Sequence, residues 1–254
     1  MTVRNLLIRG MLCGLFAGLV GAAVAKLIGE GAVGQAILFE SHKDAADGMA
    51  SGPELVSRTV QNTVGLLTGM LVFGVAIGGL FALAYACVQG RLGRLGARAT
   101  ALLVALAGFG SMYLIPGLKY PANPPSIGNP DTIGHRTAMY FLMMALALLV
   151  VIGATIAARQ LSARFRTWNG ALLAIGGGVV VIGLAYAWFP AIHETPDGFP
   201  ADVLWKFRIA SYGIQVAVWS SIGLLFGALT ERSLKPKPVA SGQAMNTSPT
   251  ANAA

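Results

Sequence analysis

The stretch TVQNTVGLLTGMLVFGVAIGGLFALAYACVQG, residues 59–90, lies between Arg58 and Arg91 and contains no charged side chain. A helix of about 20 apolar residues is long enough to cross the roughly 30 Å hydrocarbon core of a bilayer. This stretch is too long and too apolar for an ordinary core helix of a soluble protein. It therefore predicts a transmembrane helix.

Five further stretches are similarly apolar: residues 6–28, a run between Arg98 and Lys119 that stops at Pro116, and residues 137–158, 168–189 and 209–230. We therefore predict an all-α, polytopic integral membrane protein, a helical bundle of about six transmembrane helices within residues 1–232. Residues 233–254 are rich in Ala, Ser, Thr, Asn and Pro without an apolar period, which predicts a disordered cytoplasmic tail.

The first apolar stretch has a second interpretation. Its basic start and the small residues Ala23-Val24-Ala25 are also typical of a secretory signal peptide with its cleavage site. Cleavage would leave five helices and place the N-terminus outside.

The overall composition favours lipid as the solvent. Hydrophobic residues make up 55% of the chain and charged residues only 11%, against about 25% charged in soluble domains. The net charge of +8 is interpreted as a sign of membrane topology rather than of nucleic-acid binding, because the basic residues lie in short loops.

Cys13 and Cys87 both fall in apolar stretches, so we expect buried packing residues and no disulfide or zinc site.

The distribution of charge predicts the orientation. With both termini in the cytoplasm, most Lys and Arg residues lie in short inner loops, whereas every acidic residue except Glu231 lies outside. This is the pattern expected in a bacterial cytoplasmic (inner) membrane. The outer loops, residues 29–57, 117–135 and 190–207, are longer and chemically richer, so we expect function there.

Each outer loop carries one histidine with a carboxylate nearby in the sequence. The pairs are His42 with Glu40, His135 with Asp131, and His193 with Glu194. Imidazole and carboxylate together suit divalent first-row metal ions. If the loops converge, they predict an outward-facing cation site. The alternative is that the three histidines are simply solvated, because none of the pairs has the spacing of a recognised metal motif.

Other polar residues predict a shaped loop or a polar path. Five prolines between Pro116 and Asp131 limit the backbone, which favours a cap or re-entrant plug carrying Lys119, Tyr120 and Asn123, with Arg136 just beyond, over a flexible linker. Further along, Asp202 could cap a helix on which Arg208 and Gln215 lie close to one face. With Gln61 they could line a path, and hydrogen bonding between helices is the alternative.

Aromatic and small residues suggest how the helices sit in the bilayer and pack. We expect an aromatic belt near the outer interface from Tyr113, Tyr120, Tyr140, Trp188 and Trp205. Glycines four residues apart predict close helix packing, within the chain or with a partner, at Gly14/Gly18, Gly65/Gly69, Gly74/Gly78 and Gly223/Gly227. The sequence contains no P-loop, catalytic triad or zinc-protease motif, so we expect neither an enzyme nor a bound cofactor.

Several strings resemble one family. They are Gly29-Glu30, Ala36-Ile37-Leu38-Phe39-Glu40, Val56-Ser57-Arg58 with Gln61, Leu118-Lys119-Tyr120-Pro121-Ala122-Asn123-Pro124-Pro125, Gly128-Asn129-Pro130, Arg136 with Tyr140, and Phe199-Pro200-Ala201 leading to Leu204-Trp205 and Arg208. Over roughly residues 5–232 the chain is similar to the CbtA family of predicted cobalt transporter subunits.

The resemblance implies a small permease for cobalt(II) uptake linked to cobalamin metabolism. It also implies Glu30, Glu40 and His42 as the first ligand candidates, cobalt as transported cargo, and a short single-span CbtB partner beside lipid or further copies. Two alternatives stay open: a non-transporting membrane scaffold or partner subunit, and a permease for another divalent metal such as nickel.

Overall fold

The computed structural model describes residues 2–46, 48, 56–93, 95–125, 127–192 and 194–234. Over these residues the chain is helical, without strands. The elements are α1 Val3–Val24, η1 Ala25–Gly29, α2 Glu30–Ala46, α3 Arg58–Val60, η2 Gln61–Gly65, α4 Leu66–Val88, α5 Ala97–Phe109, η3 Gly110–Leu114, α6 Ile115–Lys119, η4 Pro130–Thr132, α7 Ile133–Phe165, α8 Thr167–Trp188 and α9 Ala201–Leu234. Of the short elements, η1, η2 and η3 are π-helical turns and η4 is a 3₁₀ turn.

The π-helical turns join their neighbours into longer rods. The result is six segments long and apolar enough to cross a membrane: Val3–Ala46, Arg58–Val88, Ala97–Lys119, Pro130–Phe165, Thr167–Trp188 and Ala201–Leu234. The prediction of a multi-pass helical membrane protein is thereby confirmed. The chain beyond Leu234, which includes most of the predicted tail, lies outside the described residues.

Two helix boundaries differ markedly from the prediction. The first helix does not end near Ile28 but continues as α2 to Ala46, because Ala32 and Ala36 form an apolar stripe that packs on Phe199 and Val203. Four-residue spacing places the two alanines on one face. Similarly, α9 begins at Ala201 rather than at Ile209. These extensions carry several charged residues, so a test for uninterrupted apolarity does not detect them.

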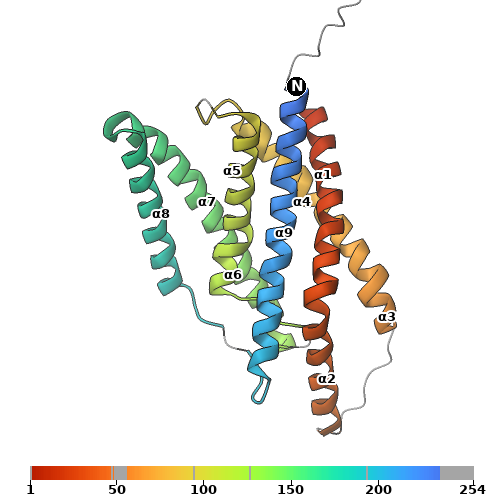
Figure 1. Ribbon diagram of the computed structural model, residues 1–254. Helices are drawn as coiled ribbons and strands as arrows, with labels where there is room; N and C mark the ends of the chain where they lie inside the picture. Colours follow the sequence, from red (N-terminus) through yellow and green to blue (C-terminus); the bar gives the residue numbers. More distant parts are fainter. Residues whose placement is uncertain are drawn as a thin grey trace, which may run out of the picture.

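The main core is formed by α1, α4, α5 and α9, while α7 and α8 lie side by side on one flank (Figure 1). Within the core the ring of Phe226 meets those of Phe81 and Tyr85 edge to face, with centroids 5.1 and 4.9 Å apart. Cys13 is buried there, but Cys87 is exposed. The packing role predicted for Cys87 is therefore wrong, because an apolar run does not reveal which face of its helix points inward.

Glycine allows α1 and α4 to approach until their backbones touch. A Cβ atom added to Gly14 would overlap the carbonyl oxygen of Gly74, and one added to Gly74 would overlap that of Gly14. Gly18 and Gly78 extend the same seam, and Gly223 and Gly227 play a similar part where α9 crosses α5. Such small-residue seams are typical of membrane helix pairs.

The Gly65/Gly69 pair does not pack against another helix. A Cβ atom at Gly69 would meet open space, and one at Gly65 would approach only Val60 of its own helical segment. Within the chain this pair therefore marks no helix contact, because spacing alone does not show whether a glycine face meets a neighbouring helix, and packing with a partner stays a prediction.

The two ends of the bundle differ in charge. The start of α1 and the end of α9 lie together (Figure 1), where Arg9 Nη1 donates to Thr230 Oγ1 at 2.9 Å. Of the described acidic residues, only Glu231 lies at this termini end, where it pairs with Arg98. The arginines that gather there are Arg4, Arg9, Arg91, Arg98, Arg159, Arg164, Arg166 and Arg232.

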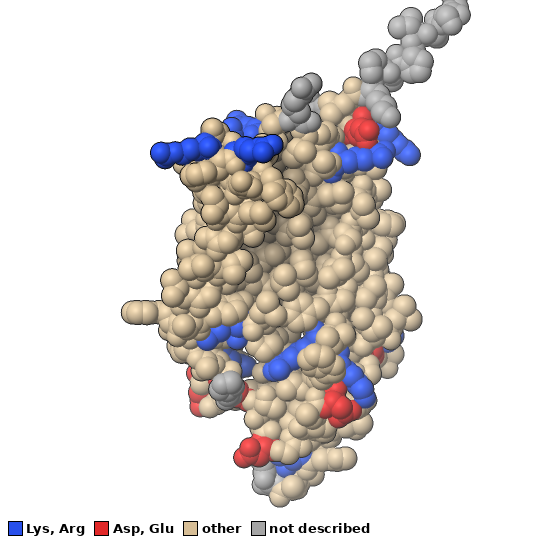
Figure 2. Space-filling model, turned by 60° about the vertical axis from the view of Figure 1, so that its left-hand side comes forward, with Lys and Arg blue, Asp and Glu red and all other residues tan. Residues whose placement is uncertain are grey.

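The opposite end, called the loop end below, carries charges of both signs. Figure 2 shows a wide band without Lys, Arg, Asp or Glu between the two charged zones. His135 begins α7 at the loop end and Arg164 lies in its last turn at the other. This sorting is what solvation of the middle by lipid requires, because charged side chains in the hydrocarbon core are costly.

Candidate functional site

A cavity of about 880 Å³ opens at the loop end of the bundle. This volume lies within the roughly 300–1,000 Å³ range that is typical of small-molecule sites. Its walls come from the end of the third segment, the proline-rich loop, the start of α7, the α8–α9 loop and the first third of α9. The lining residues are Tyr113, Gly117, Leu118, Lys119, Tyr120, Pro121, Ala122, Asn123, Ile127, Ile133, Arg136, Thr137, Tyr140, Phe141, Ala191, Ile192, Glu194, Thr195 and Arg208.

The first wall is a helix that continues past a proline. The third span was expected to stop at Pro116, but the helix runs to Lys119. Pro116 has no N–H to donate to the carbonyl of Met112, four residues earlier. Instead, the Tyr140 hydroxyl donates to the Met112 oxygen at 3.3 Å. Tyr186 of α8 likewise donates its hydroxyl to the Ile115 carbonyl, so tyrosines from two other helices support this interrupted wall.

Lys119 and Tyr120 fasten the end of this helix to the end of α8. The Lys119 ammonium donates to the Tyr186 carbonyl at 2.8 Å. Carbonyls in the last turn of a helix lack helical partners and carry partial negative charge, so a cation is favourable there. The Tyr120 hydroxyl donates to the Pro190 carbonyl at 3.0 Å. Both residues line the cavity, and neither touches a carboxylate in these contacts.

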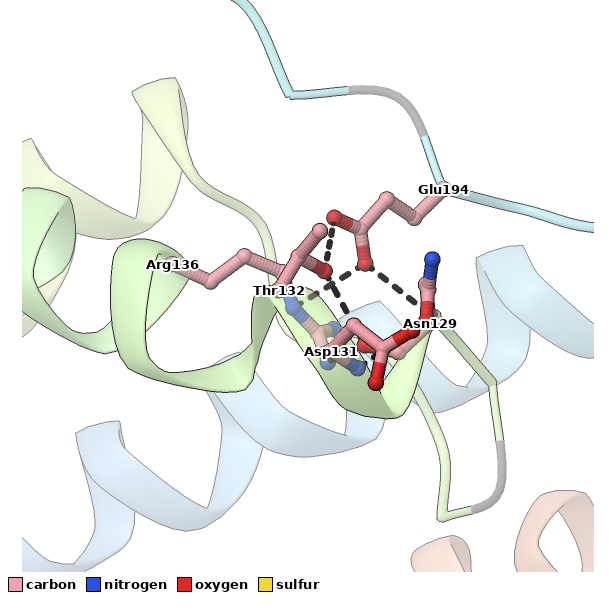
Figure 3. Close-up of polar contacts among 5 residues, drawn as sticks. All are labelled: Asn129, Asp131, Thr132, Arg136 and Glu194. Atoms are coloured by element: carbon pink, nitrogen blue, oxygen red, sulfur yellow. Dashed lines mark hydrogen bonds and ion pairs between the residues drawn. The ribbon is translucent and has the colours of Figure 1, made fainter.

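Glu194 is the centre of a polar cluster (Figure 3), and it lines the cavity together with Arg136. Its carboxylate lies 3.0 Å from Nε of Arg136, accepts a hydrogen bond from the Thr132 hydroxyl, and accepts another from the Asn129 backbone N–H at 3.1 Å. The Thr132 hydrogen bond is the main reason why the pKa of Glu194 is lowered, with further contributions from Asn129, Arg136 and His135. Both oxygens of this carboxylate therefore already have partners in the protein.

Arg208 reaches the cavity from α9. Its Nε donates to the Ala122 carbonyl at 3.3 Å and its Nη2 to Oδ1 of Asn123 at 3.1 Å. These contacts hold the middle of the proline-rich loop against α9. Among the described residues Arg208 has no salt-bridge partner within 4 Å, and the same is true of Lys119. The described part of the cavity lining thus contains three cations and a single carboxylate.

The predicted metal ligands are spread over the loop end. Glu30 is paired with Arg58 at 2.7 Å, and Glu194 with Arg136. Glu40 and His42 lie two residues apart within α2, a spacing that does not place side chains on one helical face. His193 lies outside the described residues. Within the described ranges no group of three or more His, Cys, Asp or Glu side chains could hold a metal ion.

His135 and Asp131 lie nearer the cavity than the α2 residues. Both are exposed, Asp131 in η4 and His135 in the first turn of α7. His135 is close enough to Glu194 to lower its pKa electrostatically, although less than Thr132, Asn129 or Arg136 does. The metal site involving these residues and His193 stays a prediction.

The remaining predicted path residues divide into two groups. Lys119, Tyr120, Asn123, Arg136 and Arg208 all line the cavity. Gln61 instead donates to the Val56 carbonyl at 2.8 Å and accepts from Arg58 at 3.3 Å, at the start of the second span. Gln215 lies half-buried in α9. Neither glutamine is part of the cavity lining.

The tyrosines have a role that the sequence did not predict. Tyr113, Tyr120 and Tyr140 were expected to form part of an interfacial belt, but they line the cavity, while Trp188 and Trp205 are highly exposed. The ring of Tyr113 also meets that of Tyr212, with centroids 5.2 Å apart. Because tyrosine is amphipathic, its position near a helix end fits a lipid interface and a protein cavity equally well.

A comparison with family models matches residues 3–231 to a family described as probable cobalt transporter subunit (CbtA). Neither the curated proteins nor the solved structures contain a match. The family match covers all six spans and every element that lines the cavity. The chain therefore belongs to the CbtA family of probable cobalt transporter subunits.

Proposed function

We propose that this protein is the membrane permease component of a cobalt(II) uptake system in the bacterial inner membrane, linked to cobalamin metabolism. The observation that carries the proposal is the family match over the whole membrane part of the chain. The loop-end cavity supports it, because a vestibule among spanning helices is what entry of a small solute requires.

The proposed direction is from the loop end, outside, to the termini end in the cytoplasm. The arginine-rich termini end supports this orientation, since short cytoplasmic loops are enriched in Lys and Arg. Charge at the loop end is mixed, and the acidic residues there raise the local concentration of divalent cations.

We propose that His135, Asp131 and Glu194 contribute cation ligands together with His193, which precedes Glu194 in the sequence, because the described residues alone do not form a group that could hold a metal ion. Imidazole and carboxylate oxygens are suitable cobalt(II) ligands. Proximity of His135 to Glu194 supports this set. The α2 set of Glu30, Glu40 and His42 is the competing proposal, and its members are separated by helical geometry and by the Glu30–Arg58 ion pair.

Uptake of radioactive cobalt by cells that depend on this protein tests the proposal. We expect His135→Ala to lower uptake at low cobalt concentration by about tenfold, the effect of losing one ligand interaction of about 1.4 kcal/mol. The matched control is His42→Ala, an exposed histidine at the same end. Loss of uptake only in Glu40→Ala/His42→Ala would move the site to α2. Normal uptake in all variants would contradict a His/carboxylate site.

A second candidate is a subunit that requires a partner for transport. The segments containing α7 and α8 have only 11% and 17% of their most apolar windows buried, against 33–39% for the other four. This exposed pair could bind a single-span CbtB-type helix. Purified protein in liposomes distinguishes the two: cobalt flux without a partner supports the permease, and flux only after co-reconstitution supports the partner-dependent subunit. Competition by nickel in the same assay tests metal selectivity.

A further inference from the structure

We propose that the loop-end cavity binds an oxyanion, a carboxylate or phosphate group, between Lys119, Arg136 and Arg208. The three cations belong to three different segments, α6, α7 and α9, and all line one cavity. The ligand class follows from the positive charge of these side chains. Among the described lining residues, Glu194 alone carries negative charge to balance them.

Glu194 cannot neutralise all three cations. Its oxygens are engaged by Arg136, Thr132 and Asn129 (Figure 3), which leaves Lys119 and Arg208 without an acidic partner in the described part of the chain. Both make hydrogen bonds only to neutral oxygens: Lys119 to the Tyr186 carbonyl, and Arg208 to Ala122 and Asn123. Part-buried cations without counter-charge are costly, and an anion in the cavity would remove that cost.

The hydrogen-bonding capacity of these side chains suits an oxyanion. An ammonium has three N–H donors and a guanidinium has five. The contacts above use one donor of Lys119 and two of Arg208. Arginine in particular matches the geometry of carboxylate and phosphate oxygens. The same contacts fix both side chains in position before any ligand arrives, which lowers the entropy cost of binding.

Two sources could supply this oxyanion, and the cavity is open to both. One is a small soluble anion, such as a hydroxycarboxylate or phosphate. The other is a lipid headgroup, since the apolar lining residues Leu118, Ile133 and Phe141 are 61%, 54% and 56% exposed and could contact an acyl chain.

For transport, the consequence rests on the proposed function. A bare divalent cation would be repelled by Lys119 and Arg208, so cobalt at this cavity would be accompanied by an oxyanion that coordinates it or balances its charge. Anion binding itself needs no cobalt and can be measured separately.

The experiment uses the full-length protein in nanodiscs made only of zwitterionic lipid, titrated with citrate and with inorganic phosphate by calorimetry. We expect Arg208→Gln and Lys119→Gln each to weaken binding by about tenfold or more, the effect of losing a charged hydrogen bond. Arg208→Lys, which keeps the charge, should lose less. The control is Lys206→Gln, which removes a cation that pairs with Asp202 outside the cavity.

A second arm uses nanodiscs that contain phosphatidylglycerol, with bound lipid measured by native mass spectrometry. Retention of this lipid by the wild type and by Lys206→Gln, but not by Arg208→Gln, would identify a headgroup as the oxyanion. Thermal unfolding of each variant confirms that it is folded.

Absence of binding in both arms, or binding that is equal in folded Arg208→Gln, Lys119→Gln and wild type, would overturn the proposal. Because cobalt is absent from both arms, failure here leaves the uptake proposal standing, and failure of cobalt uptake leaves this one standing.

Discussion

The hydroxyl of Tyr140 donates a hydrogen bond of 3.3 Å to the carbonyl oxygen of Met112, the residue four positions before Pro116. In an α-helix this carbonyl would accept from the residue that is proline here, which has no N–H. The contact joins α7 to the π-helical turn η3, at the cavity wall. A backbone carbonyl close to a proline thus accepts from a side chain of another span, which is favourable in an apolar environment.

Tyr140→Phe should destabilise the protein by about 0.6–1.5 kcal/mol, the range for loss of a single hydrogen bond in a protein interior or membrane. Unfolding in detergent, followed by circular dichroism, measures the change. The matched control is Tyr85→Phe, because the buried Tyr85 hydroxyl has no hydrogen-bond partner among the residues that the structure describes. Its removal should leave stability unchanged or raise it, and equal losses in both variants would contradict this interpretation.

Gly74→Ala should destabilise the fold by about 1–3 kcal/mol, the usual cost of overpacking. The new methyl group would overlap the backbone of Gly14 and force α1 and α4 apart. Gly69→Ala in the same helix is the control, since its methyl group would enter open space and alanine is the better helix former by up to about 1 kcal/mol. Thermal unfolding of the pair decides: a loss at Gly69 as large as at Gly74 would be inconsistent with a glycine seam.

The Glu194 cluster should make stability depend on acidity. Because the folded-state pKa of Glu194 is lowered from its ordinary value of 4.5, the carboxylate stabilises the fold above that value. This contribution is lost as the pH falls through the lowered pKa. As the pH is lowered below about 4.5, the melting temperature of the wild type should therefore decrease more steeply than the melting temperature of Glu194→Gln.

Glu40→Gln provides the comparison for the acid experiment. It removes a carboxylate from the same end of the molecule without touching Arg136, Thr132 or Asn129, so its pH profile should follow the wild type. Identical profiles for all three proteins would show that the Glu194 cluster does not contribute.

Orientation can be measured with single cysteines in a protein whose Cys13 and Cys87 have been replaced. We expect an impermeant maleimide to label Thr195→Cys, in the exposed α8–α9 loop, in intact spheroplasts. Ala163→Cys, exposed near the connection of α7 and α8, should be labelled only after permeabilisation. The reverse pattern would place the loop end in the cytoplasm.

The spans could be predicted from uncharged runs such as that between Arg58 and Arg91, because the thickness of the bilayer's hydrocarbon core determines how long such a run must be. The helical extension to Ala46 and the early start of α9 could not be predicted. They depend on the packing of Ala36 against Phe199 and Val203, which lie much later in the same chain. Four-residue spacing predicts helix packing equally for Gly74 and for Gly69. Only the neighbouring backbone distinguishes them.

The sequence alone determined the six apolar segments that cross a membrane and the sorting of ionisable groups to two opposite surfaces. The free-energy cost of placing a side chain in hydrocarbon depends mainly on whether it is charged, which the sequence states directly. Tertiary structure decided which of the loop-end residues meet. Lys119, Arg136 and Arg208 lie far apart in the chain, and packing of α6, α7 and α9 brings them to one cavity. Contacts of this kind depend on how helices cross, which local sequence does not encode.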